Sequence, residues 1–493
     1  MNPGPPVPEP VLARRRAGIL LHPTSLPGPG NDGVLGRHAY YFVDFLQSTG
    51  QSVWQVLPLG PTHVDRSPYF CLSAHAGNPA LISLDLASQW GWLPPPYRSG
   101  SSGASHAQLL DEIGSGFVAR ATDADGRRFE EFVARHADWL EDYVLYQAIR
   151  DQRGQAWIDW PPPLRDRDPA ALADERRGLA PNLHRLRVIQ FVFFRQWLAL
   201  RGYANGRGVR LFGDLPIYVA HDSADVWAHR DNFKLDGDGL PMVVAGVPPD
   251  QFSATGQHWG NPLYDWGRMA ADGFHWWEER MRTQVELYDL MRIDHFRGFD
   301  ACWEIPRDAA APSAGTWVRV PGEQFFDHLT VKLGALPVVA EDLGHITEAV
   351  HQLRRRYGYP GMKVLQFAFD GGPENQYLPH HHALDDVVYT GTHDNDTTRG
   401  WFESLGPGGQ ARVREYAGHA DEPMPWPLVR MALGSVCRLC ILPMQDVLGL
   451  GTGARMNTPG TLAGNWDWRF DWPQVTPEIA GRLRQLTRLY ARA

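Results

Sequence analysis

The chain has 493 residues, and the usual ~150 residues per domain would give about three domains, although one α/β barrel can reach ~250 residues or more. Its 43% hydrophobic and 21% charged residues exclude wholesale disorder. A formal net charge of −9 argues against nucleic acid or anionic lipid as the main partner. The sequence contains no 18-residue apolar stretch, so it predicts no membrane-spanning helix.

The N-terminal segment, residues 1–16, is rich in proline and then in arginine, and we expect it to be disordered. The apolar run that follows is too short for a secretory signal. Four scattered cysteines suit a reducing compartment, so we expect a cytoplasmic protein. Cys437 and Cys440 have a CxxC spacing but lack the further ligands of a zinc site, and we expect both to be small core residues of a helix.

Eight short apolar runs recur along the chain, and each ends in a cluster of polar or special residues. In chain order they are Ala17–Leu21, Val53–Leu57, Val209–Phe212, Leu290–Ile293, Val338–Ala340, Met362–Phe367, Val387–Tyr389 and Ile441–Met444. Such near-continuous apolar runs are typical of strands buried on both faces, as in a parallel sheet. Helical periodicities lie between them, for example over Tyr41–Leu46, with Gly50 as the end signal.

Eight strands alternating with helices predict an α/β fold, a (β/α)8 TIM barrel with inserted subdomains in its βα loops. An open doubly wound sheet is the alternative, but it rarely needs eight such units. We expect residues 17–493 to form this single catalytic barrel. The gap after the second run predicts a largely helical insertion at about 70–205, with helical stretches at Phe129–Arg150 and Leu186–Arg201. The gap after the third predicts an irregular insertion at about 220–275, rich in Trp, Gly and Pro.

Three carboxylates stand at strand ends, where the active sites of such barrels lie. Asp294 is two residues from Arg292, so both side chains lie on one face of a strand, and the guanidinium favours the ionised form that a nucleophile requires. Glu341 directly follows an apolar strand, where desolvation raises a carboxyl pKa towards that of a general acid. Asp394 stands beside His393.

An isolated acid is more often a surface ion pair or a structural group. Three at successive strand ends favour glycosidic chemistry, in which one carboxylate attacks and another protonates the leaving oxygen.

Long motifs surround these positions. They are Leu21-His22-Pro23-Thr24-Ser25-Leu26-Pro27-Gly28, Gly213-Asp214-Leu215-Pro216-Ile217-Tyr218-Val219, Ala245-Gly246-Val247-Pro248-Pro249-Asp250, Gln257-His258-Trp259-Gly260-Asn261-Pro262, Arg292-Ile293-Asp294-His295-Phe296-Arg297-Gly298-Phe299, Glu341-Asp342-Leu343-Gly344, Gly391-Thr392-His393-Asp394-Asn395-Asp396-Thr397-Thr398 and Gly464-Asn465-Trp466-Asp467-Trp468-Arg469. From about Ala17 onward, the chain resembles the 4-α-glucanotransferases of glycoside hydrolase family 77, also known as amylomaltases or disproportionating enzymes, which are related to the α-amylase clan.

The resemblance implies a retaining transferase that moves an α-1,4-glucan segment to the 4-hydroxyl of glucose or another α-1,4-glucan through a covalent glycosyl-enzyme. The expected partners are α-1,4-glucans (maltooligosaccharides, amylose, starch or glycogen segments) and glucose. We expect no cofactor, no metal, no nucleic acid and no membrane, and a monomer or simple homo-oligomer. The residue chemistry alone leaves open an α-amylase-like hydrolase with the same carboxylates. The intact carboxylates argue against a catalytically silent glucan-binding scaffold.

The resemblance also implies residue roles. Asp294 would be the nucleophile, Glu341 the acid and then the base, and Asp394 the group that holds sugar hydroxyls and favours ring distortion. Arg292 and His393 would position Asp294 and the same sugar, with His295 beside them. The other implied substrate-binding residues are Asp214 and Trp259 in the donor and acceptor subsites, Tyr69 and Ser67 near the donor sugar, Asp250, Phe252 and Gln257 on a loop over the acceptor side, Asn465 on an opposite loop, and Asp370 at the sixth strand end.

One segment departs from the family pattern, which usually reads Gly-Tyr-Gly-Asp before Ser-Pro-Tyr-Gln. This chain has His63-Val64-Asp65-Arg66 before Ser67-Pro68-Tyr69-Phe70. The change falls on the donor side and leaves the carboxylates untouched. Two patterns that resemble metal sites, His380–His382 and Asp236–Gly239, lack further ligands, and we interpret them as a solvated loop and a tight turn.

Overall fold

The computed structural model describes residues 10–28, 30, 32–93, 105–249, 255–418, 422–461 and 463–493. A parallel sheet of eight strands forms its centre, in the order β10-β11-β12-β1-β2-β3-β6-β9. These strands are β1 (Arg16–Leu20), β2 (Val53–Gln55), β3 (Arg210–Pro216), β6 (Leu290–Asp294), β9 (Val338–Ala340), β10 (Gly361–Val364), β11 (Asp386–Tyr389) and β12 (Leu439–Pro443). The two end strands also meet, since the Ala340 N–H donates a 2.8 Å hydrogen bond to the Pro360 carbonyl. The sheet is therefore the barrel that the sequence predicts.

The eight barrel strands correspond one to one to the eight predicted runs, and nearly all of their residues are buried. The largest difference in length concerns β3, which continues to Pro216, whereas the prediction ends it at Phe212. Asp214 consequently lies inside a strand and not after one. Its neighbour Gly213 is required there, because a Cβ at that position would lie 2.2 Å from the ring of Tyr288.

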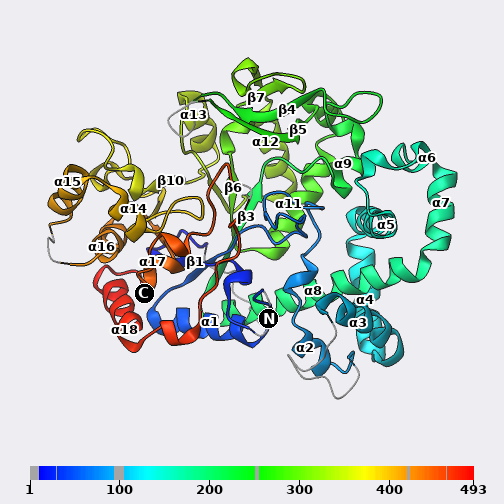
Figure 1. Cartoon of the computed structure of the whole chain (residues 1–493), viewed down its shortest axis with the longest axis horizontal. Helices are drawn as coiled ribbons and strands as arrows, with labels where there is room; N and C mark the ends of the chain where they lie inside the picture. Colours follow the sequence, from blue (N-terminus) through cyan, green and yellow to red (C-terminus); the bar gives the residue numbers. More distant parts are fainter. Residues whose placement is uncertain are drawn as a thin grey trace, which may run out of the picture.

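Helices surround the barrel (Figure 1). They are α1 (Arg37–Thr49), α2 (Leu84–Gln89), α3 (His106–Arg120), α4 (Asp123–Arg135), α5 (Ala137–Arg153), α6 (Pro162–Arg165), α7 (Pro169–Gly178), α8 (Ala180–Gly206), α9 (Ala224–Ala228), α10 (Trp266–Ala271), α11 (His275–Leu287), α12 (Gly322–Leu333), α13 (Glu348–Arg356), α14 (Thr398–Ser404), α15 (Pro407–Ala417), α16 (Trp426–Gly434), α17 (Met444–Val447) and α18 (Pro477–Leu489). The predicted stop at Gly50 is confirmed, since this residue ends α1 in the left-handed conformation with φ +78°.

Helices α2 to α8 stand between β2 and β3 and extend to one side of the barrel (Figure 1). The stretch expected at Phe129–Arg150 is two helices, α4 and α5, which meet at His136. The long helix α8 anchors the chain that follows β2. The Gln190 amide exchanges two hydrogen bonds with the backbone of Gly77, at 2.8 and 2.9 Å, and Gln196 does the same with Ser83, at 2.7 and 2.9 Å.

A second sheet lies beside the barrel, and it corrects the expectation of an irregular segment at about 220–275. Its strands are β4 (Val243–Val247), β5 (Gln257–Pro262), β7 (Ala301–Pro306) and β8 (Thr316–Arg319), paired antiparallel in the order β5-β4-β7-β8. A sequence pattern cannot reveal this pairing, since β4 pairs with a strand that follows β6. Trp259 of β5 lies close to the end of β6, since its ring contacts that of His295, and Gln257 is hydrogen-bonded to Trp259.

Residues 10–16 correct the expectation of disorder for the N-terminal segment, whose first nine residues lie outside the described part. Val11 is buried, and its carbonyl accepts a 2.8 Å hydrogen bond from Arg16 Nε. Arg15 reaches the carbonyl of Ser435 at 2.9 Å. These arginine side chains thus bind backbone carbonyls where strand β1 begins, and they hold this part of the segment in place.

The core absorbs much of the aromatic content. Trp276 and Trp277 of α11, for example, are both buried. The four cysteines are free, and Cys437 and Cys440 are buried as expected. Neither lies in the predicted helix, since Cys437 follows the end of α16 and Cys440 lies in strand β12. In the described part of the chain, no helix is both long and apolar enough to span a membrane.

Candidate active site

The predicted carboxylates meet at the C-terminal ends of the barrel strands. Asp294 ends β6, Glu341 directly follows β9, Asp394 follows β11, and Asp214 lies near the end of β3. Strands β3, β6 and β9 are neighbours in the barrel, so three of these four side chains come from adjacent positions. Parallel packing brings together residues that are far apart in the chain.

Arg292 links two of these carboxylates. Its Nη2 lies 2.9 Å from Asp294 Oδ1 and 2.8 Å from Asp214 Oδ2, and its Nε also donates to Asp214 at 3.0 Å. The Tyr69 hydroxyl completes the group, since it donates to Asp214 at 2.6 Å and accepts from Arg292 at 3.0 Å. Asp214 and Arg292 are buried, which disfavours an unpaired charge. Their charges are stable there because each is paired and hydrogen-bonded with the other.

The electrostatics of Asp294 differ in part from the prediction. Burial raises the pKa of Asp294 to about 6; the Arg292 charge opposes this rise, and the nearby Asp214 and Asp394 carboxylates add to it. Along the sequence only Arg292 stands beside Asp294, so the predicted downward shift of the Asp294 pKa is wrong in its net direction. The group is still mainly ionised at neutral pH, as a nucleophile must be.

Glu341 is held by backbone donors. Its Oε2 accepts the His295 N–H at 2.8 Å, and its Oε1 accepts the Leu343 N–H at 2.9 Å. Burial and the Asp294 charge raise the pKa of Glu341 to about 8, which confirms the predicted direction. At neutral pH Glu341 therefore carries a proton that it can donate, while Asp294 does not.

Asp394 has its own set of partners. His393 Nε2 lies 3.3 Å from its Oδ1, and Asn457 Nδ2 donates to the same oxygen at 2.6 Å. Burial favours a higher pKa, but the charge and hydrogen bond of His393, the Asn457 amide and the charge of Arg292 together hold the pKa of Asp394 below its usual range. Asp394 is thus a permanently ionised acceptor, suited to bind hydroxyl groups.

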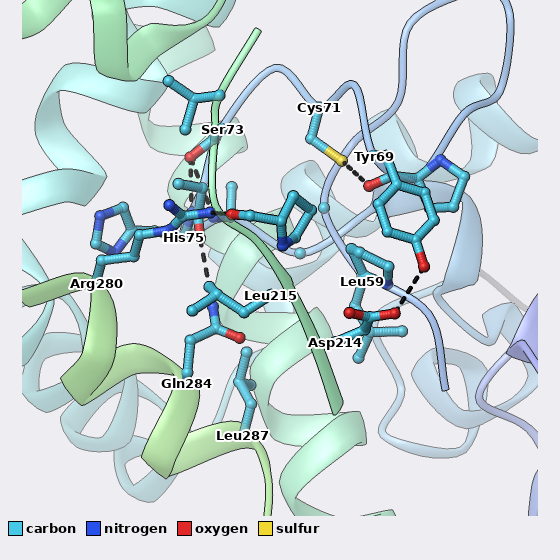
Figure 2. Close-up of a pocket in the computed structure, with 18 of the residues that line it drawn as sticks. Leu59, Tyr69, Cys71, Ser73, His75, Asp214, Leu215, Arg280, Gln284 and Leu287 are labelled. Atoms are coloured by element: carbon cyan, nitrogen blue, oxygen red, sulfur yellow. Dashed lines mark hydrogen bonds between the residues drawn. The ribbon is translucent and has the colours of Figure 1, made fainter. Parts of the chain in front are cut away.

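Aromatic rings hold Tyr69 in place. Its ring is stacked on His393 with centroids 5.0 Å apart, and Trp466 lies 6.0 Å from both rings. Next to Tyr69 and Asp214 is a cavity of about 50 Å³, with His75 and Arg280 on its far side (Figure 2). This volume can hold ordered water.

His295, Trp259 and Gln257 form a second group on the other side of Glu341. The Trp259 ring packs edge-on against the His295 ring with centroids 4.8 Å apart, and its Nε1 donates to Gln257 at 3.0 Å. Burial lowers the pKa of His295 to about 3, and its Nε2 is buried without a hydrogen-bond partner. The ring is therefore neutral, and its Nε2 is enclosed by the residues packed around it.

Of the remaining predicted residues, those that the structure describes do not contact the three carboxylates. Ser67 Oγ accepts the Tyr69 N–H at 3.4 Å, so it shapes the turn before that ring. Asp370 is exposed and accepts from Asn375 at 2.9 Å. Asn465 accepts the Thr458 N–H at 2.9 Å and thus holds its own loop together. Asp250 and Phe252 lie outside the described residues.

Sequence reasoning missed two contributors. Asn457 bonds to Asp394 as described, and His22 is buried at the end of β1, where burial and the charge of His393 lower its pKa to about 3. Each follows a barrel strand, so the rule that active sites lie at strand ends was the available signal. Among the described residues, no group of three or more histidines, cysteines and acids is arranged to hold a metal ion.

A closed (β/α)8 barrel with one protonated and one ionised carboxylate at its C-terminal rim defines a barrel enzyme that acts on glycosidic bonds. The comparisons with known proteins agree with this class. The family model described as 4-alpha-glucanotransferase matches residues 21–475, so the chain belongs to the 4-alpha-glucanotransferase family.

Relatives match the chain over nearly its full length. It is 47% identical to the 4-alpha-glucanotransferase of Thermus thermophilus, over 96% of this chain and 98% of the relative. It is 46% identical to that of Synechocystis sp., over 98% and 99%. Among solved structures, the amylomaltase from Streptococcus agalactiae in complex with acarbose has a TM-score of 0.93 and 37% identity, over 97% of this chain and all of that one. The fold is therefore that of an amylomaltase.

Proposed function

We propose that this chain transfers an α-1,4-glucan segment to the 4-hydroxyl of glucose or another α-1,4-glucan, with Asp294 as nucleophile and Glu341 as acid and base. The roles are assigned from the protonation states at neutral pH, where the Asp294 carboxylate is ionised and the Glu341 carboxyl group keeps its proton. The 4-alpha-glucanotransferases among the relatives of this chain, and the acarbose bound to the similar amylomaltase structure, support an α-glucan substrate.

In the first step, an Asp294 oxygen attacks the anomeric carbon of the donor, and the glycosidic bond breaks. Glu341 gives its proton to the departing 4-oxygen, so the released sugar leaves with a free hydroxyl. In the second step, the 4-hydroxyl of the acceptor attacks the same carbon. Glu341 accepts the proton of that hydroxyl, and the bond to Asp294 breaks. Two displacements at one carbon retain its configuration.

The other residues have supporting roles in this proposal. Arg292 orients Asp294 through its 2.9 Å contact, and Asp394 with His393 binds hydroxyls of the sugar at the cleavage point. Tyr69 and Asp214 form the donor wall. Trp259 and Gln257 lie beside His295 on the acceptor side, where they can bind a sugar that replaces water. Asp250, Phe252, Asn465 and Asp370 remain proposed contacts of longer glucans.

Incubation with maltotriose followed by sizing of the products tests the proposal. We expect glucose together with a ladder of longer glucans. Shorter products alone would identify an α-amylase-like hydrolase, and binding without turnover would identify a glucan-binding scaffold. A parallel reaction with labelled glucose should place the label at the reducing end of new chains.

We further propose that residues 17–493 act as one catalytic unit in the cytoplasm. The four free cysteines, three of them buried, fit a reducing compartment. Whether the protein is a monomer or a simple homo-oligomer stays a prediction, which light scattering coupled to size-exclusion chromatography tests.

A further inference from the structure

The turn at residues 63–66, which departs from the family pattern, has an unusual conformation. Arg66 adopts φ +63°, in the left-handed region that residues other than glycine rarely occupy. Two hydrogen bonds close the turn: the Arg66 N–H donates to the His63 carbonyl and the Ser67 N–H donates to Asp65 Oδ1, both at 3.1 Å. A strained conformation persists where surrounding contacts enforce it, so the Arg66 side chain is informative.

The Arg66 guanidinium contacts two carboxylates from two other loops. Its Nη1 lies 2.6 Å from Asp467 Oδ1, and its Nη2 is paired with Asp32. Asp32 follows β1, Arg66 follows β2 and Asp467 follows β12, and these three strands are neighbours in the barrel. One exposed ion pair contributes little, but one planar guanidinium that holds two carboxylates is a small network.

This network lies next to the active site. Asp467 directly follows Trp466, whose ring lies 6.0 Å from the ring of Tyr69, and Tyr69 is three residues after Arg66. The loops after β2 and β12 are thus joined twice, by the Arg66–Asp467 ion pair and by the Tyr69–Trp466 contact. The Tyr69 hydroxyl in turn contacts Asp214 and Arg292. If the ion pair were lost, the two loops would be joined only by the weaker Tyr69–Trp466 ring contact.

Two of the three loops are also joined without Arg66. Arg469, on the loop after β12, donates to the Leu26 carbonyl at 3.0 Å and to the Gly28 carbonyl at 3.2 Å on the loop after β1. On the far side of the turn, His63 lies 4.0 Å from Asp222, which is held by α5 through Arg150 at 2.7 Å. Arg66 therefore adds the loop that carries Tyr69 to a pair of loops that is already connected.

We propose that Arg66 is a positioning residue, which fixes the loop that carries Tyr69 to Asp32 and Asp467 and so determines how tightly this enzyme holds its donor glucan. The statement about the donor rests on the proposed function, whereas the attachment of the three loops does not. Because the contacts are partly exposed charge pairs, their strength falls as salt increases.

The test variant is Arg66→Asn, since asparagine tolerates the left-handed backbone and removes the charge. Hydrogen exchange measured by mass spectrometry should show faster exchange in peptides that cover residues 60–70. In maltotriose turnover we expect KM to rise ~3–10-fold and kcat to change less than about twofold. Raising the salt concentration should weaken donor binding in the parent enzyme and leave the KM of the variant unchanged.

The matched control is Arg356→Asn. Arg356 also pairs with two acids, Glu323 and Asp327, is similarly exposed at 47%, and lies on α13 outside the site. This variant should match the parent in KM and in exchange of residues 60–70. The exchanged pair Arg66→Asp with Asp467→Arg restores one ion pair between the two loops, and it should recover part of the lost affinity.

The outcomes separate the proposal from the function on which it rests. Unchanged exchange of residues 60–70 in Arg66→Asn would overturn the attachment of the loops. Faster exchange with an unchanged KM, or an equal fall of kcat, would overturn the role in donor binding. If the parent enzyme made no ladder from maltotriose, the proposed function would fail, while the exchange experiment would still report on the loops.

Discussion

The backbone N–H of His295 donates a 2.8 Å hydrogen bond to Glu341 Oε2. His295 has φ +54°, and this left-handed residue turns the chain so that its N–H faces the end of β9. Because His295 directly follows Asp294, the backbone that ends β6 fixes both proposed catalytic carboxylates at once. The pair can therefore tolerate changes in surrounding side chains better than changes in the turn itself.

Substitution of either proposed catalytic carboxylate tests the assignment directly. Asp294→Asn removes the nucleophile and Glu341→Gln removes the transferable proton, so we expect each to lower kcat by at least ~10³-fold while the circular dichroism spectrum is unchanged. Asp308→Asn and Glu348→Gln are the matched controls, since both carboxylates are exposed, at 91% and 62%, and lie outside the site. Turnover within tenfold of the parent in both active-site variants would contradict the roles.

The pH dependence of kcat/KM should be bell-shaped. Asp294 must be ionised, and its pKa of about 6 gives the acidic limb; Glu341 must be protonated, and its pKa of about 8 gives the alkaline limb. Initial rates in overlapping buffers, at low maltotriose concentration, give both limbs. A rate that stays constant from about pH 5 to pH 9 would be incompatible with this pair.

The raised pKa of Glu341 has a consequence for stability. The folded-state pKa of about 8 lies above the ordinary 4.5, so the folded protein binds this proton more tightly than the unfolded chain does, and the associated stability is lost as pH rises from 4.5 to 8. Glutamine cannot ionise and so removes that loss. At ~1.4 kcal/mol per pH unit above 4.5, the two pKa values imply that Glu341→Gln is more stable than the parent by up to about 4 kcal/mol at pH 7.5.

Urea unfolding at two pH values measures this effect. The difference between Glu341→Gln and the parent should disappear near pH 4.5, where both side chains are neutral. Glu348→Gln, on the surface of α13, should show no difference at either pH. A less stable Glu341→Gln at pH 7.5 would mean that the carboxylate is stabilised by its surroundings, and the proposed acid would then lack a proton at neutral pH.

The parts of the molecule that follow from local sequence were predictable. A strand buried on both faces leaves a continuous apolar run, and Asp294 and Arg292 share one face because they are two residues apart. The antiparallel sheet was not predictable, since β4 takes its partner β7 from beyond β6. The net pKa shift of Asp294 was also out of reach, because it depends on Asp214 and Asp394, which come from other strands.

The Tyr69 hydroxyl links the donor wall to the nucleophile, and Tyr69→Phe removes this link alone. Asp214 then loses a 2.6 Å donor, and its charge acts more strongly on Asp294. Since a nearby negative charge raises a carboxyl pKa, we expect the acidic limb of kcat/KM to move to higher pH and the plateau to fall ~10-fold. Tyr41→Phe, at an exposed position of α1, is the control. An acidic limb that stays in place would show that the hydroxyl has no influence on Asp294.

Asn457 is one of the two contributors that the sequence did not reveal. Its amide donates a 2.6 Å hydrogen bond to Asp394 and, together with His393 and Arg292, keeps that carboxylate ionised. Asn457→Ala removes that donor, so we expect kcat/KM to fall ~10–100-fold with little change in thermal stability. Asn457→Asp should be worse, since a second carboxylate beside Asp394 raises its pKa and repels the electron-rich hydroxyls it binds. Asn182→Ala, on α8 far from the strand ends, serves as the control. If Asn457→Asp were as active as the parent, Asp394 could not act as the permanently ionised acceptor of the sugar.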